Sequence, residues 1–79
     1  MKNEIFDVVR SVIASTCDVH AEDVKPESDL MLDLGMDSLD ALEVIMKMEQ
    51  HYNIKVPDEE TENIHTVLQL VNIVEKYVK

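Results

Sequence analysis

Residues 33 to 39 of this chain read Asp33-Leu34-Gly35-Met36-Asp37-Ser38-Leu39. Three features of the sequence meet in this stretch: a long polar segment ends, the only glycine occurs, and the strongest helical pattern begins. Ser38 stands at the junction between that segment and the helix. The stretch therefore divides the chain into the parts that decide its fold, and its serine is the first candidate for chemistry.

The helix expected from about residue 38 to 52 carries two groups of apolar side chains, separated by roughly 130° on a helical projection. The first group suits a core and contains Ala41, Val44, Ile45, Met48 and Tyr52. The second group is rimmed by acids and contains Leu39, Leu42 and Met46. A small domain does not need a second buried stripe, so we interpret it as a docking site for a partner. The alternative is that the long segment covers this stripe, which periodicity alone does not exclude.

Toward the N-terminus, apolar residues at helical spacing predict a first helix from about residue 3 to 16. From Cys17 to Asp37 the periodicity fails, and Pro26 and several acids favour a loop with one turn near residues 21 to 24. A loop of this length is more often functional or disordered than incidental. Its apolar residues are expected to pin it to the core: Val19, Val24, Leu30, Leu32 and Leu34.

Toward the C-terminus, Pro57 ends the second helix, and the acids that follow it predict a short helix from Asp58 through His65. Thr66 is expected to cap a last amphipathic helix, with Lys76 and Lys79 suited to the dipole at its C-terminal end. The fold predicted for residues 1 to 79 is one all-α domain. It is a four-helix bundle with three longer helices, one short helix and a long loop between the first and second helices.

The net charge of −10 is concentrated in one segment. Residues 27 to 62 contain eleven acidic and two basic side chains, which leaves −9 there. A field of this sign repels nucleic acid and anionic lipid and attracts basic protein surfaces. We therefore expect basic protein partners and no nucleic acid, although an acidic face that only keeps the protein in solution is the alternative.

The single cysteine, Cys17, excludes an internal disulfide and fits a reducing compartment. The chain starts with no apolar stretch long enough for a signal peptide or a membrane span. We therefore expect a cytoplasmic monomer that does not insert into membranes.

Ser38 could be a nucleophile, a modification site or only a helix cap. The sequence around it lacks the second glycine of a nucleophile elbow, and the three histidines form no recognisable triad, so we expect no catalytic residue. Serine commonly caps a helix, and capping does not exclude modification. The unpaired N–H groups at a helix start also favour a phosphate there. No specific metal site is expected, because an EF-hand register around Gly35 would place leucines at the ligand positions.

The motif at residues 33 to 40, the acids Glu43 and Glu49, and the run Val56-Pro57-Asp58-Glu59-Glu60 resemble acyl carrier proteins over nearly the whole chain. This resemblance implies that Ser38 receives a 4'-phosphopantetheine group from coenzyme A, whose thiol holds acyl chains as thioesters. It implies that a phosphopantetheinyl transferase and basic surfaces of fatty acid synthase enzymes bind Asp37, Leu39, Asp40, Leu42, Glu43, Met46 and Glu49. It also implies that the acyl chain lies near Ile45, Met48, Val56, Thr61, Ile64 and Leu70.

The leading hypothesis is thus a discrete, non-catalytic carrier for type II fatty acid biosynthesis. A second carrier hypothesis shares Ser38 but serves polyketide, aminoacyl or specialised lipid synthesis. A third, from a different class, is an acidic helical adaptor that never carries a prosthetic group. Intact mass after incubation with coenzyme A and a phosphopantetheinyl transferase separates the carriers from the adaptor.

Overall fold

The computed structural model describes residues 2 to 62 and 64 to 78, and it is helical. Its elements in chain order are α1 (Lys2–Cys17), the 3-10 turn η1 (Ala21–Asp23), α2 (Ser38–Tyr52), α3 (Asp58–Thr61) and α4 (Val67–Val78). Within these two ranges there is no strand, only an isolated bridge between Asp29 and Thr66. The all-α prediction of three longer helices and one short helix is confirmed.

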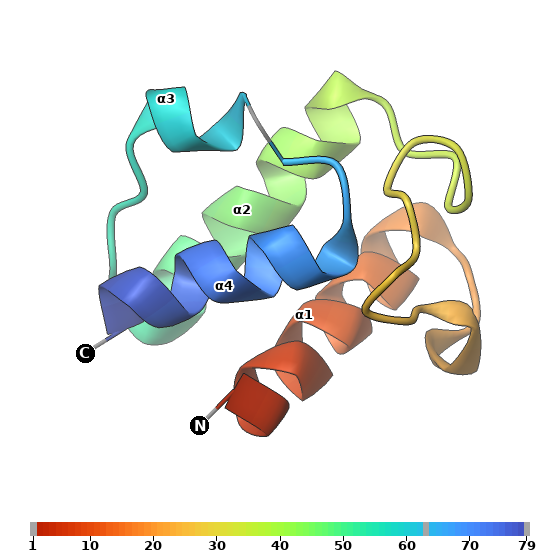
Figure 1. Cartoon of the computed structure of the whole chain (residues 1–79), viewed down its shortest axis with the longest axis horizontal. Helices are drawn as coiled ribbons and strands as arrows, with labels where there is room; N and C mark the ends of the chain where they lie inside the picture. The colour runs from red at the N-terminus through yellow and green to blue at the C-terminus, as the bar shows by residue number, and fades with distance from the viewer. Residues whose placement is uncertain (1, 63, 79) are drawn as a thin grey trace.

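The core lies where α1 packs against both α2 and α4 (Figure 1). Each helix contributes side chains that are almost fully buried, such as Val9 in α1, Met48 in α2 and Val71 in α4. The predicted core stripe of α2 is confirmed at Val44, Ile45 and Met48, whereas Ala41 and Tyr52 are half-buried at its edges. No helix in the described ranges is long and apolar enough to cross a membrane.

The long connection between α1 and α2 is tied firmly to the start of α4. The N–H groups of Val67 and Leu68, which have no partner within their own helix, donate to Ser28 O at 3.1 Å and Pro26 O at 2.9 Å. In return, Leu30 N donates to His65 O at 2.8 Å. The predicted pinning of the loop is confirmed for Val24, Leu30 and Leu34, which are buried, and Val19 is half-buried.

The prediction that Leu32 pins the loop is wrong, because this side chain is 86% exposed. Residues 29 to 34 form a helix-like turn, in which Asp33 N donates to Asp29 O at 3.0 Å. Asp29 Oδ1 also accepts from Met31 N at 2.9 Å and Leu32 N at 2.8 Å. At a helical spacing, residues 30 and 34 share the side that faces the core, so residue 32 is directed away from it.

The predicted short helix is also too long, because α3 ends at Thr61 and does not continue to His65. The physical reason is tertiary: Ile64 is buried, and the carbonyl of His65 pairs with the long connection. Asn63, inside the predicted span, and Lys79, expected near the last dipole, lie outside the described residues.

The predicted cap of the last helix is confirmed. Thr66 Oγ1 accepts from Gln69 N at 3.2 Å, and Gln69 Oε1 accepts from Thr66 N at 3.1 Å. This reciprocal pair satisfies two N–H groups at the start of α4. It fixes the point at which the segment after α3 enters the bundle.

Candidate functional site

Ser38 is the first residue of α2, and the residue that caps this helix is Asp37. Asp37 Oδ1 accepts from Asp40 N at 2.8 Å, and Asp40 Oδ2 accepts from Asp37 N at 3.5 Å. The idea that Ser38 itself serves as the cap is therefore wrong. Its side chain is exposed, and within the described part of the chain no hydrogen bond engages its hydroxyl. A serine in this position is accessible for modification without disturbing the cap.

Gly35 shapes the approach of the chain to this serine. Its φ of +69° lies in the left-handed region, which residues with a Cβ adopt at a cost. Immediately after it, Met36 is buried and its N–H donates to Leu30 O at 3.0 Å. The glycine thus turns the chain and Met36 anchors it, so that α2 starts at a fixed place on the surface.

Ser38 lines a cavity of about 320 Å³ between α2, the segment that contains α3, and the long connection. Most of the lining residues are apolar: Leu30, Met31, Ala41, Leu42, Ile45, Ile64 and Leu70. The polar ones are Ser38, Thr61, Glu62 and His65. A volume of this size lies within the range of small-ligand pockets, which are roughly 300–1,000 Å³. The arrangement places a free hydroxyl at the edge of a space suited to an apolar chain.

The structure brings together four of the six residues that the resemblance assigned to the acyl chain. Ile45, Thr61, Ile64 and Leu70 line the cavity. Met48 is fully buried within the helical core and Val56 is also buried, and neither reaches this cavity.

Sequence reasoning missed several other lining residues, including Leu30, Met31, Ala41 and Leu42. The available signal was in α2, where Ala41, Leu42 and Ile45 follow the i, i+1, i+4 spacing of a single face that starts beside Ser38. The loop residues had no such signal, because their positions depend on the turn at residues 29 to 34.

The second apolar stripe of α2 is exposed, as predicted. The exposed fractions are 74% for Leu39, 45% for Leu42 and 50% for Met46. The long connection therefore does not cover the stripe, and that alternative is wrong. Met31, at the mouth of the cavity with Leu42, is half exposed and adds a loop residue to the apolar surface around Ser38.

Two of the acids beside this stripe have partners within the protein. Glu43 Oε2 lies 3.3 Å from Lys47 Nζ, and Lys47 Nζ in turn donates to Thr16 Oγ1 at 3.1 Å. Glu49 Oε2 accepts from Val56 N at 2.7 Å, which ties the end of α2 to the chain that precedes α3. Glu49 thus has a structural role that the sequence did not reveal.

Cys17, at the end of α1, lies in the field of the acids at the start of α2. Partial burial raises the pKa of its thiol above the ordinary value, and the charges of Asp40, Asp37 and Glu43 raise it further. The thiol is therefore held in its protonated, weakly nucleophilic form at neutral pH.

Residues 7 to 74 match the family described as "Phosphopantetheine attachment site". Two curated relatives carry the name acyl carrier protein. The one from Picosynechococcus sp. is 43% identical over 74 residues, covering 94% of this chain and 91% of the relative. The one from Wolinella succinogenes is 45% identical over 71 residues, covering 90% and 93%.

The chain therefore belongs to the family of proteins with a phosphopantetheine attachment site, and within it to the acyl carrier proteins. Its prosthetic group is 4'-phosphopantetheine. Members of this family are non-catalytic carriers, so the chain is an acyl carrier on which synthase enzymes act, and it is not itself an enzyme.

Proposed function

We propose that Ser38 Oγ is the point at which 4'-phosphopantetheine is attached, and that the loaded protein carries acyl intermediates of type II fatty acid biosynthesis in the cytoplasm. The observation that carries the proposal is the position of Ser38: an exposed hydroxyl at the start of α2, beside an apolar cavity of about 320 Å³. In this proposal residues 1 to 79 act as one monomeric carrier domain.

The residues around Ser38 suit a phosphodiester. The capping box uses the N–H of Asp40, and the N–H of Ala41 donates to Asp37 O at 3.0 Å, whereas the N–H groups of Ser38 and Leu39 have no partner among the described residues. Such free N–H groups at the positive end of a helix dipole stabilise an anion. When bound, the phosphopantetheine supplies the thiol on which acyl groups are held as thioesters. Ile45, Ile64 and Leu70 provide apolar contacts for an acyl chain in the adjoining cavity.

The proposed partner surface surrounds this serine. Leu39, Leu42 and Met46 supply its apolar centre, and Asp37 and Asp40 supply negative charge at the start of α2. Glu43 and Glu49 belong to the same proposed surface, although the first is paired with Lys47 and the second holds a backbone N–H. We infer that the partners, a phosphopantetheinyl transferase and synthase enzymes, have basic residues around an apolar surface that contacts this stripe.

The test of the attachment site is intact mass after incubation with coenzyme A and a phosphopantetheinyl transferase. The natural sequence should gain the mass of one phosphopantetheine group, and Ser38→Ala should gain nothing. Ser15→Ala is the matched control, because Ser15 is also an exposed helical serine and should not affect loading. Loading of Ser38→Ala, or loss of loading in Ser15→Ala, would contradict the assignment.

The pathway is tested separately, with the loaded protein. A type II malonyl transferase and ketosynthase should transfer malonyl to it and extend an acyl chain. Efficient loading by phosphopantetheinyl transferase without any transfer by these enzymes would favour the polyketide, aminoacyl or specialised lipid alternative.

A further inference from the structure

The short helix α3 is held to the bundle with little apolar burial of its own. None of its four residues is buried, and it packs against no other helix as extensively as α1 packs against α2 and α4. The apolar anchors of this segment, Val56 and Ile64, lie on either side of the helix. Something else must therefore fix the orientation of α3 between these two anchors.

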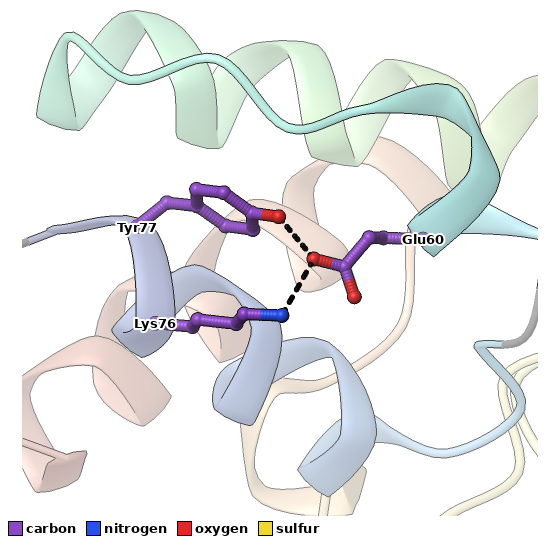
Figure 2. Close-up of polar contacts among 3 residues, drawn as sticks. All are labelled: Glu60, Lys76 and Tyr77. Carbon is purple, nitrogen blue, oxygen red and sulfur yellow. Dashed lines mark hydrogen bonds and ion pairs between the residues drawn. The ribbon is translucent and has the colours of Figure 1, made fainter.

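A side-chain cluster between α3 and the last turn of α4 supplies that contact (Figure 2). Glu60 Oε2 accepts from Lys76 Nζ at 3.2 Å and from the hydroxyl of Tyr77. The side chain of Glu60 is 24% exposed and that of Lys76 is 64% exposed, and Lys76 Nζ also lies 5.5 Å from the centroid of the Tyr77 ring. We call Glu60, Lys76 and Tyr77 the α3 clamp.

The clamp residues do not themselves line the cavity beside Ser38, but Glu60 immediately precedes two residues that do. Thr61 and Glu62, the two residues after Glu60, form the part of the cavity wall that comes from α3 and its end. Any movement of Glu60 away from α4 therefore moves this wall. By contrast, the opposite wall, at Ala41 and Ile45, belongs to a helix that is part of the core.

We propose that Glu60, Lys76 and Tyr77 are positioning residues for the acyl cargo: they hold α3 as one wall of the cavity and so determine how firmly an acyl chain is retained. This inference rests on the proposed function of the cavity. When the clamp is intact, α3 covers the chain. When the clamp is released, α3 can turn about the anchors Val56 and Ile64 and expose the chain to solvent or to a partner enzyme.

The hydrogen bonds of the clamp should be present only within a defined range of pH, because all three of its side chains are titratable. Hydrogen bonds from Tyr77 and Lys76 lower the pKa of Glu60 below its ordinary value of 4.5, so its contribution is present above that value and is lost as the pH falls through the lowered pKa. The same carboxylate raises the pKa of Lys76 and of Tyr77, and burial and the charge of Glu59 raise that of Tyr77 further. Their donor forms therefore persist at neutral pH, and the clamp is intact there.

The first experiment uses the unloaded protein and does not depend on the proposed function. Tyr77→Phe and Glu60→Gln should raise the exchange rate of the amide hydrogens at residues 60 to 62 by roughly threefold to tenfold. The matched controls are Tyr52→Phe, the other tyrosine, and Glu59→Gln, the exposed neighbour in α3, which should leave these rates unchanged. Lys76→Ala should behave like the clamp variants, and Lys76→Arg should restore protection.

The pH profile separates a clamp from a general structural defect. As the pH falls through the lowered pKa of Glu60, exchange in the natural sequence should approach that in Glu60→Gln, so that the ratio of the two rates tends to one. A ratio that stays constant with pH would overturn the clamp. Equal effects of Tyr52→Phe and Tyr77→Phe would also overturn it.

The second experiment loads the protein with an octanoyl thioester and follows its cleavage by hydroxylamine. Tyr77→Phe and Glu60→Gln should accelerate cleavage about threefold or more relative to the two controls, because the chain is covered for a smaller fraction of the time. Unchanged cleavage despite faster amide exchange would show that the clamp holds α3 but not the cargo. Failure of Ser38 to accept phosphopantetheine would instead refute the proposed function and leave the exchange result standing.

Discussion

Two of the helices that line the cavity, α2 and α3, are held in place by different kinds of interaction. α2 buries Val44, Ile45 and Met48 in the core and starts with a reciprocal capping box. α3 has four residues and buries none of them, and its contact with α4 is a carboxylate with two donors. Apolar packing changes little without unfolding, whereas an exposed polar contact can break locally. The cavity therefore has one wall that is part of the core and one that can move alone.

The largest expected effect on stability comes from a substitution in α2, which forms the fixed wall of the cavity. Ile45→Ala should lower the free energy of unfolding by about 2–5 kcal/mol, because it leaves a hole beside the core. Met46→Ala, one residue further along α2 but half exposed, should change it by only about 0.5 kcal/mol. Urea denaturation of both variants measures the difference. Similar losses in the two would mean that α2 is buried on both faces.

A smaller effect should come from the turn that sets the start of α2. Gly35→Ala should cost about 1–2 kcal/mol, because a left-handed φ strains a residue with a Cβ. Apart from the two chain neighbours, no heavy atom of the described residues lies within 4 Å of where that Cβ would stand, so the cost is conformational and does not come from a clash. Gly35→Asn should cost less, since asparagine tolerates this conformation. Equal stability of the glycine and alanine proteins in thermal denaturation would show that the turn relaxes freely.

The cap of α2 should contribute less to the free energy of unfolding than the glycine at position 35 does. Asp37→Ala should lower the free energy of unfolding by about 1 kcal/mol, whereas Asp37→Asn should retain most of it because its side chain still accepts the N–H of residue 40. Ser38→Ala should cost clearly less than Asp37→Ala in the same urea titration. The reverse order would identify Ser38 as the functional cap.

The smallest effect on global stability is expected at the movable wall. Glu60→Gln should leave the urea midpoint of the whole protein close to that of the natural sequence, because local opening of α3 requires less free energy than global unfolding. Urea titrations followed by both near- and far-ultraviolet circular dichroism measure this midpoint. A large shift of the midpoint would place α3 in the same cooperative unit as α2.

The bounds of α2 and the division of its apolar residues could be predicted from the sequence, because both depend on helical periodicity within one segment. The extent of α3 and the exposure of Leu32 could not. Ile64 leaves the helical path to fill the core, and His65 pairs with Leu30 across the fold. The exposure of Leu32 follows from a turn in which the Asp29 side chain accepts from the N–H groups of Met31 and Leu32. In each case a contact between distant segments, or a local side-chain bond, overrides the pattern.

The same limit applies to the site. The position of Ser38 followed from the motif and from the helix that begins there, and four of the six proposed cavity residues line the cavity. Met48 follows Ile45 by three residues but is fully buried in the core and does not line the cavity. The clamp was not predictable, because Glu60 and Tyr77 are seventeen positions apart and meet only through tertiary structure.

The environment of Cys17 has a practical consequence for labelling chemistry. A loaded carrier would have two thiols, and a maleimide reacts with the thiolate form. Partial burial and the acids of α2 raise the pKa of the Cys17 thiol, so this side chain should react slowly at neutral pH. A fluorophore, spin label or crosslinker added at pH 7 should therefore label Cys17 more slowly than it labels a fully exposed cysteine with an ordinary pKa.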